Sequence, residues 1–287
     1  MISMRNIKKI ITTKTTIEGA GVKLERVFGF SEVPHFDPFL LLDHFGSPNP
    51  KDYLKGFPWH PHRGIETVTY MLDGEVAHAD SLGNKGTIKS GDIQWMTAGS
   101  GIIHQEMPKA YNGNMQGFQL WINLQKKNKM IPPQYRGISQ KDIVIVNRSE
   151  STIKLIAGSL DGTKASLTDL NEDIEYFDVK LSGTFKHDTT KKTVLIYVIE
   201  GSIKILDQKL SDHHCVLLGG SGEISIESKN GRFLFIAGNP LNEPIAWGGP
   251  IVMNTQKELH QAFKELDEGT FIKHGKSVEL HEEYYDA

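Results

Sequence analysis

Short stretches in which apolar and polar residues alternate recur along the 287-residue chain, separated by turns rich in glycine. Residues 64–72 follow this pattern, Asp73-Gly74 is a strong two-residue hairpin signal, and residues 75–80 return as the partner strand. Strands that follow one another closely, with no helical pattern between them, predict an all-β sandwich or barrel. The same rhythm gives further strand candidates at residues 86–89, 93–96, 116–124, 193–200, 202–206 and 231–237.

One helix is predicted near the C-terminus. Thr255 and Glu258 have the spacing of a capping box, in which each residue bonds the other's backbone N–H group. Gly269 then stands where the helix should end. Apolar residues recur between these signals at the spacing of one helix face, which we expect to pack on a barrel: Leu259, Ala262, Phe263 and Leu266.

The two halves of the chain resemble each other weakly. Residues 70–74 (YMLDG) correspond to residues 197–201 (YVIEG), and the Gly-Ser-Gly of residues 99–101 returns at residues 220–222. A tandem duplication is therefore predicted, with two β-barrels in sequence. Residues 125–150, a stretch with the polar basic patch KKNK and Pro132-Pro133, form the candidate linker, so we expect domains at residues 1–130 and 131–287, with the helix in the second.

Composition narrows the class of protein. The net charge is −3 and no basic stripe stands out, so direct binding of nucleic acid is not expected. The single cysteine, Cys215, excludes an internal disulfide and a zinc site built from several cysteines. No apolar run has the length of a signal peptide core or a membrane span. We expect a cytoplasmic protein with no membrane association.

Two pairs of side chains are candidates for metal ligands. His60 and His62 stand two residues apart in a β-like segment, and His104 and Glu106 repeat that spacing after a Gly-rich turn. Positions i and i+2 of a strand project from one face, roughly 6–7 Å apart. Three imidazoles and one carboxylate suit Fe, Mn, Co, Ni, Cu or Zn and leave coordination positions open. A single metal ion with a catalytic role is predicted.

The repeat predicts that the second half holds no metal. At the offsets of the two matching segments, His60 corresponds to His187 but His62 corresponds to Thr189. His104 and Glu106 likewise correspond to Ser225 and Glu227. The second half therefore keeps only one imidazole and one carboxylate of the four candidate ligands.

Other polar residues near the histidines have weaker claims. Glu66 shares strand parity with His60 and His62, so it is an alternative carboxylate ligand. Arg63 and Gln116 could line the pocket, although Arg63 could equally form a structural salt bridge. His78 and Asp80 mimic a ligand pair, but we expect His78 on an exposed strand face.

At this point the motifs resemble those of a known family. G-x-x-x-H-P-H-R-G-x-E at residues 56–66 resembles the first cupin motif, and G-x-G-x-x-H at residues 99–104 resembles the second. HPHRGIETVTYMLDG, GDIQWMTAGSGIIHQEMP and LNEPIAWGGPIVMNT are similar to pirins, and the resemblance covers most of residues 20–272. It implies a bicupin, two facing β-barrels with metal in the N-terminal one.

The resemblance also implies a ligand set. Pirins hold non-haem Fe(II) through three histidines and one glutamate. The resemblance implies that these ligands are His60, His62, His104 and Glu106 in this chain. Most cupins take the carboxylate from the position of Glu66, but the pirin pattern favours Glu106. Glu66 would then support the ligands through hydrogen bonds, and we expect Arg63 and Gln116 to lie around them.

Pirin-like proteins are associated with the quercetin 2,3-dioxygenase reaction, the O2-dependent ring cleavage of a flavonol with release of carbon monoxide. Glu106 could both ligate the metal and accept the enol proton of the substrate. A second implied function is a non-enzymatic, iron- and redox-responsive regulator that binds a protein partner as a transcriptional cofactor. A third is a metal site for another small oxygenated substrate. A monomer is expected, because duplicated barrels cover one another's edges.

Overall fold

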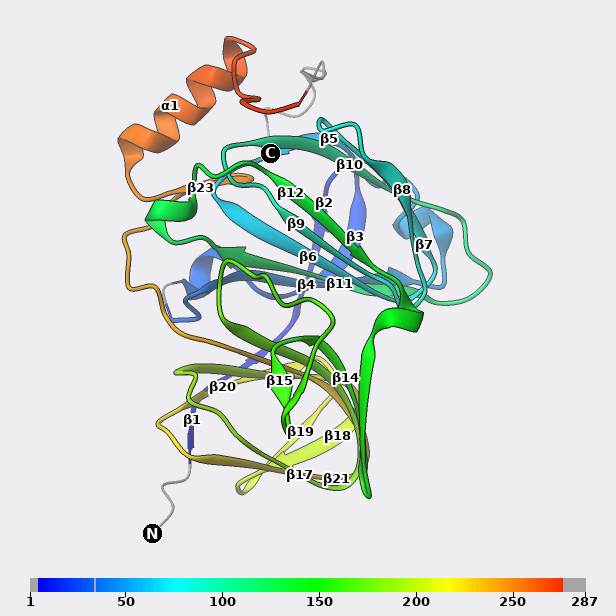
Figure 1. Cartoon of the computed structure of the whole chain (residues 1–287). Coiled ribbons are helices and arrows are strands. Elements are labelled where there is room, and N and C mark those ends of the chain that lie inside the picture. Colours follow the sequence, from blue (N-terminus) through cyan, green and yellow to red (C-terminus); the bar gives the residue numbers. More distant parts are fainter. Residues whose placement is uncertain (1–4, 34, 276–287) are drawn as a thin grey trace. The chain divides into compact units, whose positions relative to one another are not determined.

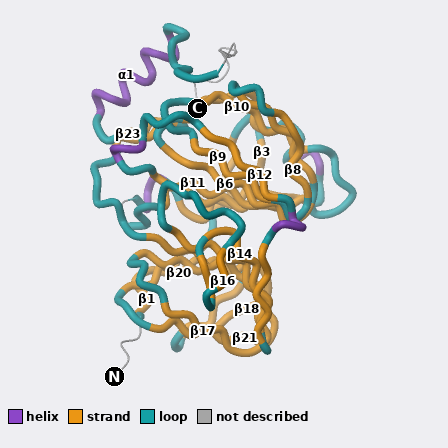
Figure 2. Tube along the Cα trace, in the orientation of Figure 1, coloured by secondary structure: helices purple, strands orange, loops and turns teal. Residues whose placement is uncertain are grey.

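The computed structural model describes residues 5–33 and 35–275 (Figure 1). The acidic and aromatic tail from Lys276 lies outside these residues. Strands dominate the described part of the chain, which contains one α-helix, α1 (Gln256–Asp267) (Figure 2). The predicted all-β class is confirmed. None of the helices in residues 5–33 and 35–275 has the length and apolarity needed to cross a membrane.

The chain divides into two compact units, each built from three separate stretches. Unit 1 contains Met1–Lys14, Val27–Pro38 and Lys141–Leu241, and unit 2 contains Thr15–Arg26, Phe39–Gln140 and Asn242–Ala287.

Unit 1 is built on an eight-stranded antiparallel sheet with the order β1-β20-β18-β21-β17-β14-β13, and β19 pairs with β18. Register shifts in β17, β18 and β21 mark bulges, which bend long strands. Alternate residues of these strands form one apolar core. The bounds are β1 (Asn6–Thr12), β13 (Val144–Arg148), β14 (Ser151–Ala157), β17 (Ile174–Asp188), β18 (Thr193–Ile205), β19 (Gln208–Ser211), β20 (His214–Gly219) and β21 (Glu223–Gly238), with a small hairpin of β15 (Ser159–Leu160) and β16 (Thr163–Lys164).

Unit 2 contains a seven-stranded sheet of order β12-β9-β6-β11-β4-β3-β2 and a four-stranded sheet of order β5-β10-β7-β8. The short pair β22-β23 precedes α1. The bounds are β2 (Lys14–Glu18), β3 (Val22–Phe28), β4 (Phe39–Ser47), β5 (Phe57–His62), β6 (Ile65–Asp73), β7 (Glu75–Asp80), β8 (Lys85–Lys89), β9 (Ile93–Thr97), β10 (Ile102–Pro108), β11 (Met115–Asn123), β12 (Gln134–Ile138), β22 (Ala246–Gly248) and β23 (Ile251–Met253).

The strand faces of unit 2 separate polar from apolar side chains. Thr69 on β6 lies opposite Gln119 on β11, and both side chains therefore share one face of the sheet. We call this the site face. The alternate positions, among them Val68 and Leu120, point to the other face and are fully buried.

Helix α1 confirms the helix prediction. The Thr255 hydroxyl accepts a hydrogen bond from the Glu258 N–H (3.2 Å), and the Glu258 carboxylate accepts one from the Thr255 N–H (2.9 Å). Gly269 follows with a φ of +67°, a conformation that favours glycine. The buried face of the helix packs in an apolar cluster with residues of β10 and β23.

The units do not coincide with the predicted cut at residue 130. Strand β1, at the N-terminus, pairs with β20, so it belongs to unit 1. Helix α1, predicted in the second domain, contacts β22 and β23 and belongs to unit 2. The predicted linker is not free of structure either, since it contains β12 and β13. Pairing between distant strands leaves no mark in local periodicity, so a cut in the sequence does not reveal how these units are composed.

Candidate metal centre

Three histidines converge on one face of the four-stranded sheet. Strands β5 and β10 pair antiparallel, and His104 lies directly opposite His60. His60 and His62 are two residues apart on β5, so they share that face. The potential ligand atoms of these three histidines all lie within 4.8 Å of one another. The two histidine motifs therefore meet, as the sequence predicts.

Backbone carbonyls determine which ring nitrogen of two histidines carries hydrogen. His60 Nδ1 lies 2.9 Å from the Pro58 carbonyl oxygen, and His62 Nδ1 lies 3.1 Å from that of Pro250. A carbonyl only accepts hydrogen bonds, so each Nδ1 is the donor and each neutral Nε2 keeps a lone pair. These two Nε2 atoms are 3.1 Å apart. Two lone pairs that face each other favour a cation between them.

The third imidazole completes the set. His104 is 2% exposed, and its Nε2 is buried with no hydrogen-bond partner among the residues that the structure describes. Two nitrogens bound to neighbouring positions of one first-row metal ion, each about 2.1 Å from it, lie about 3 Å apart. The His60–His62 separation and the orphaned His104 nitrogen fit such an ion.

Burial keeps all three imidazoles neutral, which is the form that binds metal. Desolvation lowers the pKa of His60 to about 4. Desolvation and the nearby His60 lower the pKa of His62 well below its usual value. The pKa of His104 is lowered in the same way, by burial first and by its histidine neighbours second.

These shifts predict how acid acts on the metal-free protein. A histidine in the unfolded chain takes up a proton near pH 6.5, whereas His104 in the folded protein stays neutral to a much lower pH. The unfolded state thus binds more protons below pH 6.5, and the free energy of unfolding falls by about 1.4 kcal/mol per pH unit for each such histidine. We expect the chelator-treated wild type to lose stability more steeply between pH 6 and pH 5 than His104→Gln, measured by urea denaturation. Parallel pH profiles would contradict the neutral state of His104.

Glu106 lies two residues beyond His104 on β10, and its carboxylate has other partners. Thr69 Oγ1 donates to Oε1 and Gln119 Nε2 donates to Oε2, each at 3.0 Å. Burial raises the pKa of Glu106, and these two hydrogen bonds offset part of that rise. Glu106 is not among the three residues whose ligand atoms cluster. The Glu106 side chain therefore extends from β10 toward the site face of the other sheet, where residues of β6 and β11 hold its carboxylate.

Glu66 does not share a face with the histidines, contrary to the parity prediction. Gly64, at a φ of +78°, separates β5 from β6, so the alternation restarts after the turn. Glu66 accepts a hydrogen bond from Thr97 Oγ1 at 2.6 Å, and it points to the face opposite Thr69.

Arg63 and Gln116 also have partners other than the metal ligands. Arg63 is 2% exposed and forms an ion pair with Glu265 at 2.7 Å. This ion pair is the structural salt bridge that was expected as the alternative to a place in the pocket lining. Gln116 Nε2 lies 2.7 Å from His44 Nε2. His44 lies opposite Phe118, whose side chain points away from the site face.

His78 and Asp80 are buried, so the prediction of an exposed strand face for His78 was wrong. They pair with Glu106 and His104, respectively, between β7 and β10. Asp80 accepts hydrogen bonds from the N–H groups of Leu82 and Asn84, both at 2.9 Å, and so caps a turn. Burial by neighbouring strands cannot be predicted from the strand's own residues.

Sequence reasoning missed the residues that hold Glu106. Thr69 and Gln119 lie within strands that are otherwise strongly apolar, and polar residues at alternate positions of such strands are the one available signal. Trp121 shares their face and packs edge-on to His62, with 5.0 Å between the ring centroids. The hydroxyl oxygen of Tyr135 on β12 lies 2.9 Å from His78 Nε2. Tyr135 thus adds a polar group to the site face.

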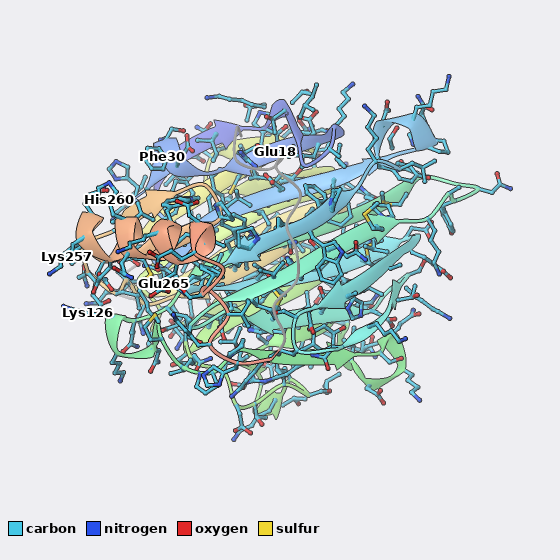
Figure 3. All side chains as sticks on the ribbon, turned by 90° about the horizontal axis from the view of Figure 1, so that it is seen from above. Glu18, Phe30, Lys126, Lys257, His260 and Glu265 are labelled. Carbon is cyan, nitrogen blue, oxygen red and sulfur yellow. The ribbon has the colours of Figure 1, made fainter. Side chains whose placement is uncertain are left out.

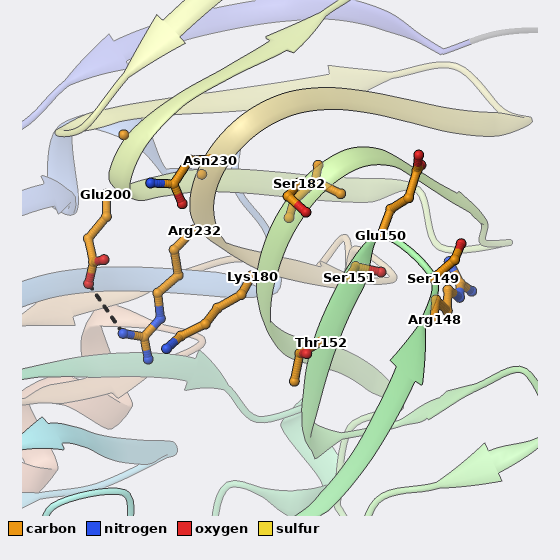
Figure 4. Close-up of a pocket in the computed structure, with 13 residues that line it drawn as sticks. Arg148, Ser149, Glu150, Ser151, Thr152, Lys180, Ser182, Glu200, Asn230 and Arg232 are labelled. Atoms are coloured by element: carbon orange, nitrogen blue, oxygen red, sulfur yellow. Dashed lines mark hydrogen bonds and ion pairs between the residues drawn. The ribbon is translucent and has the colours of Figure 1, made fainter.

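The corresponding positions of unit 1 are arranged differently. His187 bonds Glu175 at 3.0 Å and lies among phenylalanine rings. Ser225 and Glu227 alternate with Ile224 and Ile226, which point into the apolar core. Unit 1 also has a hollow of about 380 Å³ where its bent strands meet, lined by polar and charged side chains (Figure 4).

Comparison with known sequences identifies the family. Residues 21–122 match Pirin, and residues 176–272 match the Pirin C-terminal cupin domain. The first match contains His60, His62, His104 and Glu106.

The chain belongs to the pirin family.

Relatives of this pirin match more than nine tenths of its length. A Pseudomonas aeruginosa protein named "Putative quercetin 2,3-dioxygenase" is 42% identical over 281 residues, covering 94% of this chain and 99% of the relative. Human pirin is 38% identical over 277 residues, covering 93% of each chain. The crystal structure of a quercetin 2,3-dioxygenase from Acinetobacter baumannii superposes with a TM-score of 0.86 at 34% identity, covering 94% of this chain and 99% of that one. The predicted resemblance to pirins is confirmed, and the two units have cupin-like folds. Their sheets are open, jelly-roll-like sheets and not the closed barrels that were predicted.

Proposed function

We propose that this pirin is a metal-dependent dioxygenase that opens the ring of a flavonol with O2, as in the quercetin 2,3-dioxygenase reaction. The observation that carries the proposal is the convergence of His60 Nε2 and His62 Nε2 at 3.1 Å beside the orphaned His104 Nε2. Relatives named for this reaction over almost the full chain support the choice of substrate.

In this proposal His60, His62 and His104 hold one divalent ion, and Glu106 completes the ligand set. Fe(II) is our proposed metal, although the donor set is also compatible with Mn, Co, Ni, Cu and Zn. When bound, the ion supplies a Lewis acid that favours the ionised form of an acidic enol and a centre that can exchange electrons with O2.

The protein's own residues orient the substrate and handle its proton. Glu106 has a raised pKa, so its carboxylate is a better base than an exposed one and is suited to take the enol proton. Thr69 and Gln119 hold that carboxylate in place. Trp121, against the His62 ring, offers an aromatic wall for a planar substrate. Both atoms of O2 enter the opened product, and one ring carbon leaves as carbon monoxide.

Glu106→Gln tests the role of the carboxylate. The amide keeps the size of the side chain but removes the base, so we expect the metal to be retained, with lower affinity, while turnover falls roughly a hundredfold or more. O2 uptake and carbon monoxide release with quercetin would be measured against Glu75→Gln, a change at a partly exposed carboxylate on β7. Unchanged turnover in Glu106→Gln would reject the assignment.

The proposed activity itself is tested by O2 consumption. Protein purified without oxygen and loaded with Fe(II) should consume O2 when quercetin is added and release carbon monoxide in equal amount. Bound iron without O2 consumption would overturn the dioxygenase proposal and favour the regulator. A partner captured more strongly with Fe(II) than with Fe(III), or the reverse, would then identify that function.

We also propose that unit 1 binds no metal ion. The apolar core of unit 1 is filled by Ile224 and Ile226, which alternate with Ser225 and Glu227, the positions that correspond to His104 and Glu106. The expected stoichiometry is one ion per chain. We further propose a cytoplasmic monomer, which size-exclusion chromatography with light scattering and cell fractionation would check.

A further inference from the structure

The segment that precedes α1 contacts His62, which is the last residue of β5, and the two residues that follow it. The Pro250 carbonyl accepts the hydrogen bond from His62 Nδ1 (3.1 Å), and the Val252 N–H donates to the Arg63 carbonyl (3.0 Å). At Gly64, a Cβ atom would come within 2.0 Å of the Val252 oxygen, so only glycine fits. The backbone of residues 250–252 thus contacts residues 62, 63 and 64 in turn.

Lys129 is buried and links residues 62–64 to residues 250–252 through hydrogen bonds. Its side chain is 1% exposed, and its Nζ donates to the Gly64 carbonyl (2.8 Å), the Val252 carbonyl (2.9 Å) and Asn123 Oδ1 (2.6 Å). An ammonium group has three N–H donors, and each of them has an acceptor here. Lys129 therefore joins the turn after His62 to the segment that holds the His62 ring.

Arg63 connects the same turn to α1 and the residues that follow it. Its Nε donates to the Ser100 carbonyl and its Nη2 to the Phe271 carbonyl, both at 2.8 Å, and Nη1 lies 2.7 Å from Glu265. The guanidinium also lies 4.1 Å from the centre of the Phe271 ring. Glu265 is further bonded by Lys273 at 3.0 Å. Lys257 and His260 on the same helix are exposed, whereas Glu265 is only partly so (Figure 3).

Apolar packing also joins the C-terminal segment to β5 and β10, the strands that hold the three histidines, on the face opposite the histidines. Ile103 belongs to the cluster formed by β22, β23 and α1, and Trp59 packs against that cluster. These residues alternate with His104 and His60, so they point from the opposite face of β10 and β5. The same C-terminal segment therefore contacts the metal strands from behind and holds the His62 ring through Pro250.

We propose that residues 246–275, which we call the C-terminal brace, position His62 for metal binding, with Lys129, Arg63 and Glu265 as the positioning residues. This inference rests on the proposed metal site. The partner of the second ring nitrogen of a metal-bound histidine fixes the orientation of the ring, and loss of such a partner typically lowers metal affinity 10–100-fold. Here that partner is a backbone carbonyl whose place depends on the brace.

Matched pairs of variants test the brace. Lys129→Met removes three hydrogen bonds at nearly constant volume, and Lys127→Met changes an exposed lysine of the same turn. Glu265→Gln weakens the Arg63 contact, and Glu268→Gln is its exposed control on the same helix end. The full chain would be loaded with Co(II), and two quantities measured: the rate of metal loss to excess chelator and the visible absorption spectrum of the bound ion. Circular dichroism would check the fold of each variant.

We expect Lys129→Met and Glu265→Gln to release Co(II) roughly tenfold faster than wild type or more, with altered spectra, while both controls behave as wild type. A folded Lys129→Met or Glu265→Gln with wild-type release and spectrum would overturn the brace. If Lys129→Met does not fold, Glu265→Gln decides the question. A wild-type protein that binds no Co(II) would reject the metal site and the brace with it, an outcome distinct from failure of the variants alone.

Discussion

His62→Ala should remove the metal ion and with it the flavonol cleavage. His62 is 2% exposed, its Nδ1 is committed to the Pro250 carbonyl, and its Nε2 faces His60 Nε2 at 3.1 Å. No other potential ligand among the described residues joins the three-histidine group. Loss of one of a few protein ligands costs several kcal/mol of binding free energy, so we expect the affinity for the ion to fall roughly a hundredfold or more.

Metal content after gel filtration and O2 uptake with quercetin would be measured for His62→Ala and for His260→Ala. His260 is an exposed histidine on α1, so its replacement should leave both quantities unchanged. Full metal occupancy in a folded His62→Ala protein would show that His62 is not a ligand.

The second large effect concerns stability. Asp178→Asn should destabilise the protein by about 3–5 kcal/mol, because it leaves the Arg232 guanidinium without its buried counter-charge. The Asp178 carboxylate is 1% exposed and accepts two hydrogen bonds from Arg232, at 2.9 and 2.7 Å. The same two-bond geometry joins Arg148 and Asp161 at the surface, at 2.9 and 2.8 Å, where the Asp161 side chain is 54% exposed.

Asp161→Asn is therefore a matched control, and it should cost less than about 1 kcal/mol. Urea denaturation followed by fluorescence would measure both variants at pH 7. Equal losses of stability in the two variants would contradict the view that burial, rather than bond geometry, decides the effect.

Features set by neighbouring residues could be predicted from the sequence. The cap and the apolar spacing of α1 are local, and the structure reproduces both. The His60–His62 pair follows from strand alternation alone. That His104 meets this pair depends on the pairing of β5 with β10, which no local pattern in either segment determines.

Features set by distant pairing could not be predicted. Glu66 was assigned to the face of the histidines because parity was continued through Gly64, where the chain turns into another sheet. His78 was expected at the surface, but β8 and β10 pair with its strand on both sides and it is 8% exposed. The same reason explains why β1 and α1 belong to units far from their positions in the sequence.

A crystal structure of the protein loaded with Fe(II) under anaerobic conditions would test the central claim most directly. Anomalous diffraction at the iron edge should locate one ion per chain, bound by the Nε2 atoms of His60, His62 and His104 and by the Glu106 carboxylate. The absence of an iron peak among these three nitrogens, or an ion bound at other residues, would contradict the account.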